Sequence, residues 1–111
     1  MTIEECKNAW QLEKKDFEAF LMIDKSLSKN TLDAYVHDVN ILQEYLLEYK
    51  KMIILPQDVQ EGVLQDFLYY LTMDIGLSST SQNRLVSGIK AFYKSMLYND
   101  KIETNPIDVI D

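Results

Sequence analysis

Residues 77–99 read LSSTSQNRLVSGIKAFYKSMLYN, a stretch with one arginine, two lysines and no acidic residue. The whole chain has a formal net charge of -7, so the sign of the charge is reversed locally. Drawn as a helix at about 100° per residue, the stretch has two different faces. The apolar face carries Leu85, Val86, Ile89, Phe92, Tyr93, Met96 and Leu97. The opposite face carries, in a stripe roughly 60° wide, Asn83, Ser87, Lys90 and Lys94. This pattern predicts a helix that packs on one side and can meet phosphates on the other.

The start of this predicted helix is rich in hydroxyl groups. Ser78, Ser79, Thr80 and Ser81 stand next to the backbone N–H groups that the first turn of a helix leaves unpaired. These groups lie at the positive end of the helix dipole, which favours anions. Together with the cationic stripe, the pattern predicts a helix that faces DNA. On the residues alone a solvated face remains the other interpretation, because lysine and arginine are mostly exposed.

Two more helical patterns lie between residues 16 and 51. The first covers 16–25, or starts as early as Ile3, and its core candidates are Phe17, Phe20, Leu21 and Ile23. The second begins at Ser28, a favourable N-cap, and ends near Lys50-Lys51, because cations suit a helix C-terminus. Its apolar face carries Leu32, Tyr35, Val36, Val39, Leu42, Leu46 and Tyr49. Its polar face carries Asp33, His37, Asn40 and Glu44.

A further helix is predicted between residue 58 and Gly76. The spacing Asp58-x-x-Glu61 resembles a capping box, and Gly76 is the expected C-cap. Its apolar residues are Val59, Val63, Leu64, Phe67, Leu68 and Leu71. Short connections between four helices of about 10 to 20 residues predict a compact all-α domain. The sequence shows no internal repeat, and periodicity leaves open a parallel-axis bundle or two crossed helical hairpins.

Length and composition fit one small folded domain. The chain has 111 residues, 47% of them hydrophobic. It has no run near the ~20 apolar residues of a membrane span. Its N-terminus lacks the basic and apolar regions of a secretory signal, and Cys6 has no internal partner. These features predict a cytoplasmic protein without membrane contact, in which Cys6 has an incidental role.

The acidic total argues against DNA binding, because phosphate neutralisation needs basic groups. The charge is unevenly distributed, however: residues 52–74 contain four acidic residues and no lysine or arginine. A polarised domain can therefore present one face to DNA and another to solvent or protein. The acidic third helix is interpreted as a solvated face, with a protein-contact surface as the alternative.

The sequence offers no constellation for catalysis or for a cofactor. It has one arginine and one histidine, and no His/Cys cluster or glycine-rich phosphate loop. We therefore predict no metal, no small-molecule cofactor and no catalytic residue. His37 is expected in solvent, with a DNA contact as the alternative, and Trp10 either caps the core or belongs to an extra helix. Four tyrosines lie in apolar helical patterns and are predicted to pack: Tyr35, Tyr69, Tyr70 and Tyr93.

Four segments, in this order and spacing, resemble a known family. They are Ser28-Lys-Asn-Thr-Leu-Asp-Ala-Tyr35, then Asp38, then Ser79-x-Ser81-x-Asn83-Arg84-Leu85-x-Ser87-x-Ile89-x-x-Phe92-Tyr93, and finally Asn105-Pro106. Over about residues 17–106 the chain resembles the N-terminal core-binding (SAM-like) domain of Xer-type tyrosine recombinases and phage integrases.

The resemblance implies crossed helical hairpins that form one half of a C-shaped clamp around duplex DNA. The other half is a C-terminal catalytic domain that this chain does not contain. It also implies a domain at 16–106, preceded by an extension at 1–15, helical or not, and followed by the start of a linker at 107–111. The DNA contacts that it implies come from the starts of the second and fourth helices: Lys29, Asn30, Thr31, Ser79, Thr80, Ser81, Asn83, Arg84, Ser87 and Lys90.

We therefore predict the DNA-binding domain of a site-specific tyrosine recombinase. Its partners would be the double-stranded DNA of a recombination half-site and other recombinase protomers. The chain alone is not expected to be an enzyme, because the implied catalytic groups lie in the absent domain. The alternative is an acidic all-helical protein-interaction module that binds no nucleic acid.

Overall fold

The computed structural model describes residues 1–108, which form four α-helices and no strand. The helices are α1 (Ile3–Ala19), α2 (Lys29–Glu44), α3 (Glu61–Tyr70) and α4 (Ser79–Tyr98). Five-residue π-helical turns extend the first three helices, at Phe20–Asp24, Tyr45–Tyr49 and Leu71–Ile75. A short 3-10 turn, Pro56–Asp58, precedes α3. The predicted all-α class is confirmed.

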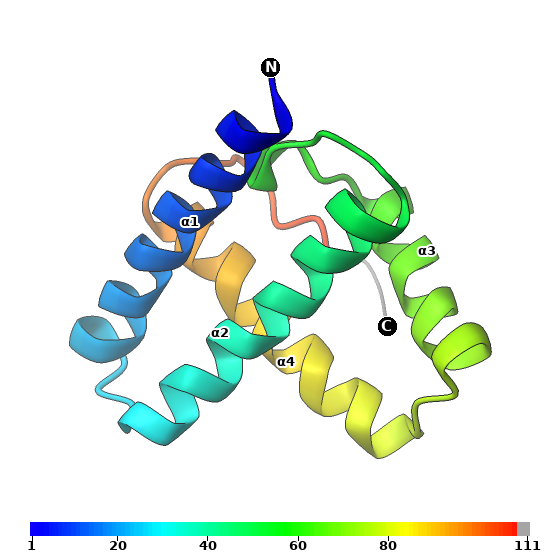
Figure 1. The fold of residues 1–111 in the computed structure, drawn as a ribbon. Coiled ribbons are helices and arrows are strands. Elements are labelled where there is room, and N and C mark those ends of the chain that lie inside the picture. Colours follow the sequence, from blue (N-terminus) through cyan, green and yellow to red (C-terminus); the bar gives the residue numbers. More distant parts are fainter. Residues whose placement is uncertain (109–111) are drawn as a thin grey trace.

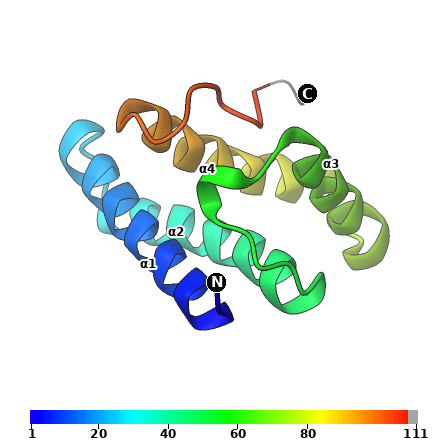
Figure 2. The same ribbon diagram turned by 90° about the horizontal axis from the view of Figure 1, so that it is seen from above.

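The helices pair into two hairpins that cross each other. α1 descends to a tight turn from which α2 returns, and α3 and α4 repeat this path on the other side (Figure 1). α2 and α4 cross at the centre and share the most extensive contact between any two elements. Viewed from above, α1 and α3 lie on opposite sides of this crossing (Figure 2). Of the two arrangements left open by the sequence, the described residues adopt the crossed hairpins.

Local sequence signals explain where the helices begin and end. Thr2 caps α1, and Ser28 and Ser78 cap α2 and α4, each through a side-chain oxygen that accepts a backbone N–H. Gly76 ends the third helical segment in the left-handed conformation, with φ of 76°. The predicted caps Ser28 and Gly76 are confirmed. α1 begins at Ile3, the earlier of the two predicted starts.

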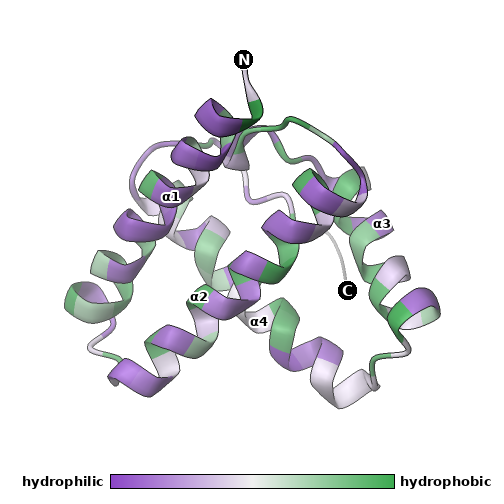
Figure 3. Ribbon diagram, viewed as in Figure 1, coloured by the Kyte–Doolittle hydropathy of each residue, from purple (hydrophilic) through white to green (hydrophobic). Residues whose placement is uncertain are grey.

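Aromatic side chains fill the centre of the core. Trp10 is fully buried and stacks on Phe92 with ring centroids 6.2 Å apart. Its indole N–H donates to the Ile54 carbonyl at 2.9 Å, and the Tyr93 hydroxyl donates to the Pro56 carbonyl at 2.9 Å. These bonds tie the connection between the hairpins to the core. Along α1 and α2 hydrophilic and hydrophobic residues alternate, as expected for helices that pack on one side (Figure 3).

Four residues expected to pack are exposed instead. Ile23, which is 76% exposed, and Tyr49 lie in π-helical turns, whose wider coil moves them off the 3.6-residue apolar stripe. Tyr69 follows the buried Phe67 by two residues and therefore lies on the other side of α3. Leu97 is partly exposed at the edge of the apolar face of α4, next to the buried Met96.

The predicted capping box at the start of α3 is wrong. Asp58 belongs to the 3-10 turn, and Gln60 is the N-cap, without a side-chain hydrogen bond to the helix. Pro56 explains the difference, because its fixed φ favours a turn at this point. The extended residue Val59 then separates that turn from α3.

None of the helices among residues 1–108 is long and apolar enough to span a membrane. Ile107 is buried against the core. The last three residues of the predicted linker, 109–111, lie outside the described residues. The predicted division at 1–15, 16–106 and 107–111 stays a prediction, and α1 continues through residues 15 and 16 without interruption.

Candidate nucleic-acid interface

The start of α4 presents a cluster of exposed hydroxyl groups. The Ser78 side chain accepts the backbone N–H of Ser81 at 3.2 Å, and the two hydroxyls lie 3.1 Å apart. Ser79, Thr80 and Ser81 are all exposed. The unpaired backbone donors of the first helical turn and these hydroxyls thus stand together at the positive end of the helix, which suits an anion.

The polar stripe of α4 is exposed along its whole length. Asn83, Ser87, Lys90 and Lys94 are all open to solvent, whereas the facing residues pack in the core. The Ser87 hydroxyl donates to the Asn83 carbonyl at 3.0 Å, so its lone pairs, rather than its proton, remain for an external partner. The amphipathic division predicted for this helix is confirmed, apart from Leu97.

The start of α2 is built in the same way. The Ser28 side chain accepts the Thr31 N–H at 3.3 Å, and Lys29, Asn30 and Thr31 are exposed. The Lys29 ammonium lies 3.3 Å from the carboxylate of Asp33, one turn further along the helix. This ion pair is open to water and reduces the positive charge that Lys29 presents.

The two helix starts lie at opposite corners of one edge, with the α2–α4 crossing between them (Figure 1). The structure thus divides the ten predicted contact residues into two groups. One group belongs to the start of α2: Lys29, Asn30 and Thr31. The other lies on α4 between its start and Lys90: Ser79, Thr80, Ser81, Asn83, Arg84, Ser87 and Lys90. No described contact tests whether these residues bind DNA, so their role stays a prediction.

Arg84 differs from the other predicted residues because it has a buried partner. Its Nη1 donates to Oδ2 of Asp38 on α2 at 2.5 Å. The Asp38 residue is 4% exposed, whereas the Arg84 side chain is 45% exposed. The guanidinium also lies over the ring of Tyr35, 5.4 Å from its centroid. Arg84 is therefore both anchored to α2 and accessible from outside.

Gly88 makes room for this ion pair. A Cβ atom at Gly88 would stand 2.0 Å from Oδ2 of Asp38 and 2.8 Å from its Cβ. Glycine in the middle of a helix costs about 1 kcal/mol relative to alanine, so its position here has a packing reason. Sequence reasoning missed the roles of Asp38 and Gly88. The available signals were an acidic residue beside the apolar stripe and a glycine inside a helical pattern.

Burial and the ion pair act on Asp38 in opposite directions. Burial raises the pKa of the Asp38 carboxyl above its ordinary value, and the hydrogen bond and positive charge of Arg84 partly oppose that rise.

A second buried charge lies in the first hairpin, where Lys14 bridges α1 to α2 by donating to Asn40 and Gln43 at 2.7 and 2.8 Å. Burial lowers the pKa of its ammonium. Both groups are structural bridges between helices.

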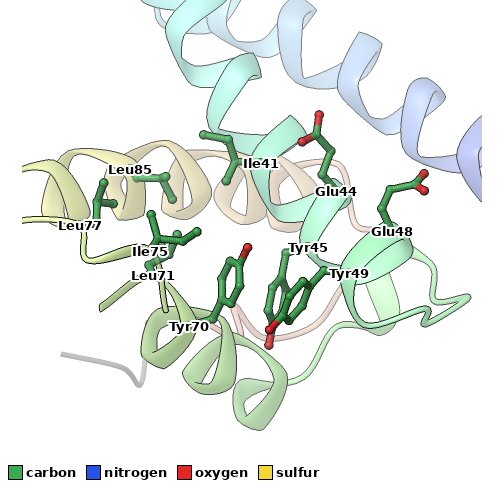
Figure 4. A pocket seen from close by; sticks show the side chains of 10 residues that line it. All are labelled: Ile41, Glu44, Tyr45, Glu48, Tyr49, Tyr70, Leu71, Ile75, Leu77 and Leu85. Carbon is green, nitrogen blue, oxygen red and sulfur yellow. The ribbon is translucent and has the colours of Figure 1, made fainter. Parts of the chain in front are cut away.

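A separate apolar groove of about 470 Å³ lies between the C-terminal part of α2 and the second hairpin. The rings of Tyr45, Tyr49 and Tyr70 form one side of it (Figure 4). Its two charged lining residues are both acidic, Glu44 and Glu48. The apolar residues along the remainder are Ile41, Leu71, Ile75, Leu77 and Leu85. The groove therefore offers an apolar floor with negative charge at its edge.

The described residues contain no group of three His, Cys, Asp or Glu side chains that could hold a metal ion. The sulfur of Cys6 is buried and lies 3.2 Å from the Ile54 carbonyl. Burial raises the pKa of the Tyr93 hydroxyl, which already donates a hydrogen bond inside the core. His37 is exposed on α2. None of these arrangements suggests a nucleophile or a cofactor site.

Comparison with known proteins gives a consistent picture. The family model described as "Phage integrase, N-terminal SAM-like domain" matches residues 15–98. The tyrosine recombinase XerC of Pediococcus pentosaceus is 27% identical over 85% of this chain. The tyrosine recombinase XerD of Staphylococcus epidermidis is 30% identical over 87%, and XerC of Leptospira interrogans is 29% identical over 83%. No solved structure gives a significant match.

The matched region is a limited part of each relative. The chain covers 31% of the Pediococcus protein, 32% of the Staphylococcus protein and 29% of the Leptospira protein. It therefore spans about a third of the length of the curated relatives it matches. The family model names the N-terminal domain, so the similarity concerns that domain alone.

Proposed function

The chain belongs to the phage integrase N-terminal SAM-like domain family, and on that premise we propose that it is the DNA-binding domain of a site-specific tyrosine recombinase. The starts of α2 and α4 contact the duplex of a recombination half-site. Other recombinase protomers assemble beside it on the paired sites. Because the proposed substrate is DNA, we propose that the protein acts in the cytoplasm.

The acid-free outer face of α4 is the observation that carries this proposal. Its exposed groups combine a hydroxyl-rich helix start with the amines of Lys90 and Lys94, and residues 77–99 include no carboxylate. Lysines, hydroxyls and helix N-termini are the groups that usually bind DNA phosphates. The face is exposed although the chain as a whole is acidic, which supports a local role in binding an anion.

Strand breakage and joining belong, in this proposal, to the part of the recombinase outside this chain. Such chemistry requires a tyrosine nucleophile and several cations around the phosphate. The only arginine of this chain is paired with Asp38, and its most buried tyrosine donates to a backbone carbonyl. Incubation with nicked half-site DNA should give no covalent protein–DNA adduct on denaturing gels.

The isolated chain should bind DNA weakly, because few cations reach the proposed face. Non-specific DNA binding at physiological salt is often only ~10⁻⁴ to 10⁻⁶ M. Tethering to a second DNA-binding domain raises affinity by ~10² to 10⁴ through effective concentration, without a new contact here. We therefore expect at best micromolar binding near 150 mM salt, where the Debye length is about 8 Å, with tighter binding as salt falls.

An NMR titration of the 111-residue chain with short duplex DNA at several salt concentrations tests this function. Shifts should concentrate on residues 29–31 and 79–90. Lys90→Ala should weaken binding and flatten the log-affinity against log-salt slope by about 0.9, because one phosphate contact is lost. Lys50→Ala removes the same charge beyond the opposite end of α2 and should change the slope little. Equal slopes for the two variants would contradict the proposed face.

The apolar groove supports a second candidate, a protein-interaction module. Its acidic edge and apolar floor fit a basic amphipathic helix of a protein partner. A lysine–leucine peptide should then shift the resonances of Ile41, Leu71 and Ile75, whereas a glutamate–leucine peptide of equal length should not. This candidate replaces the first one if duplex DNA causes no shifts even at low salt.

A further inference from the structure

We propose that Asp38 is a positioning residue for Arg84: the buried carboxylate fixes the guanidinium at the crossing of α2 and α4, with its free donors toward bound DNA. This inference rests on the proposed function, and it concerns a buried residue that is not among the ten predicted DNA contacts. Asp38 does not itself meet the DNA, because only 4% of it is exposed and phosphates would repel its charge.

The packing at the crossing is specific for this role. Asp38 approaches α4 at Gly88, where any larger residue would collide with the carboxylate. Gly88 lies one helical turn after Arg84, so the space that it leaves stands directly beside the guanidinium's partner. The Asp38 carboxylate thus belongs to α2 and packs against α4 at Gly88. Its Oδ2 atom accepts the hydrogen bond from Arg84 Nη1 there.

Arg84 retains donors for an external acceptor. A guanidinium has five N–H groups. Among the described residues, its one hydrogen-bond acceptor is Asp38, reached through Nη1. Tyr35 covers one face of the group, and the side chain remains 45% exposed. With two fixed partners, Arg84 meets a phosphate oxygen or a base edge in a geometry that is set before DNA arrives.

Preorganisation of this kind increases affinity because less side-chain freedom is lost on binding. For one long side chain we expect a gain of about threefold to tenfold. The negative charge of Asp38 acts in the opposite direction by repelling phosphates. The two effects are separated by comparison with Asp33, a second acid on α2, which is exposed and pairs with Lys29 instead.

The test compares Asp38→Asn with Asp33→Asn in DNA titrations of the 111-residue chain. Both variants remove one negative charge from α2, so both relieve repulsion. Asp33→Asn should bind duplex DNA as tightly as the unmodified chain or slightly more tightly. Asp38→Asn should bind about threefold to tenfold more weakly. In an Arg84→Ala background the Asp38→Asn change should have no further weakening effect, because it acts through Arg84.

A direct measurement covers the case in which Asp38→Asn fails to fold. In the unmodified chain, ¹⁵N relaxation of the Arg84 Nε–Hε group should give an order parameter close to that of the backbone N–H groups. The ammonium of the exposed Lys29 should instead move freely. A freely moving Arg84 would overturn the inference, as would Asp38→Asn binding like Asp33→Asn. Absence of DNA binding by the unmodified chain would instead reject the proposed function.

Discussion

The turn between α1 and α2 and the turn between α3 and α4 share the same hydrogen bonds. The N–H of Leu27 donates to the Leu21 carbonyl at 3.1 Å, and the N–H of Leu77 donates to the Leu71 carbonyl at 2.9 Å. A serine follows each leucine, caps the next helix and has nearly the same backbone angles in both places. The two turns therefore repeat one geometry fifty positions apart, and the sequence repeats with them at Leu21 and Leu71 and at Leu27-Ser28 and Leu77-Ser78.

The charge on the corresponding helix faces is opposite. Four polar positions on α2 carry Asp33, His37, Asn40 and Glu44. The positions fifty residues later on α4 carry Asn83, Ser87, Lys90 and Lys94. The α2 face thus carries two acids and the α4 face two lysines, and at one position Glu44 on α2 corresponds directly to Lys94 on α4. The backbone alone does not make a DNA-binding face, and side-chain charge assigns most of that proposed role to α4.

The crossing is where the two hairpins depend on each other. Asp38 and Gly88 occupy corresponding positions of α2 and α4, and the carboxylate fills the space that the glycine leaves. One hairpin supplies the side chain and the other supplies the gap. The difference between the hairpins is therefore also a structural requirement, because a side chain at both positions would force the helices apart.

The largest expected effect comes from filling that gap. Gly88→Ala should destabilise the fold by about 1–3 kcal/mol, because the new methyl group collides with Asp38. Gly62→Ala is the matched control, since a Cβ there meets nothing within 4 Å. It should raise stability by up to about 1 kcal/mol, because alanine is the better helix former. Urea unfolding of both variants measures the difference, and equal effects would mean that the crossing is loosely packed.

Sequence reasoning reached those parts of the fold that local chemistry determines. The N-cap Ser28 and the C-cap Gly76 were predictable because each signal involves neighbouring residues only. Ile23 was not, since a regular 3.6-residue pattern cannot show that a helix ends in a π-helical turn. The contact between Asp38 and Arg84 joins residues far apart in the sequence, and periodicity carries no information about which residue of one helix meets another.

A second, smaller difference between the hairpins lies in their turns. Ser26 and Gly76 occupy corresponding positions, and both have positive φ, 53° and 76°. Only glycine adopts this conformation without strain. Gly76→Ala should therefore cost about 1 kcal/mol, and Ser26→Gly should recover part of such a cost. Thermal unfolding of the two single variants tests this expectation, which a stabilising Gly76→Ala or a destabilising Ser26→Gly would contradict.

The smallest expected effect is the pH dependence of the contact that joins the hairpins. Burial raises the pKa of Asp38, while Arg84 and, more weakly, His37 oppose the rise. The folded chain therefore holds this proton more strongly than the unfolded chain does. The resulting contribution to stability is full below the ordinary pKa of 3.8 and is lost as pH rises through the raised value. Asp38→Asn has no such proton, so its stability relative to the unmodified chain should improve between about pH 3 and neutrality.

In an Arg84→Ala chain the opposition from the guanidinium disappears, and the pKa of Asp38 should rise further. Urea unfolding at a series of pH values, with the Asp38 carboxyl followed by NMR, measures both changes. A relative stability of Asp38→Asn that falls with pH would mean that the ion pair outweighs burial, and the crossing would then owe its geometry to charge more than to packing.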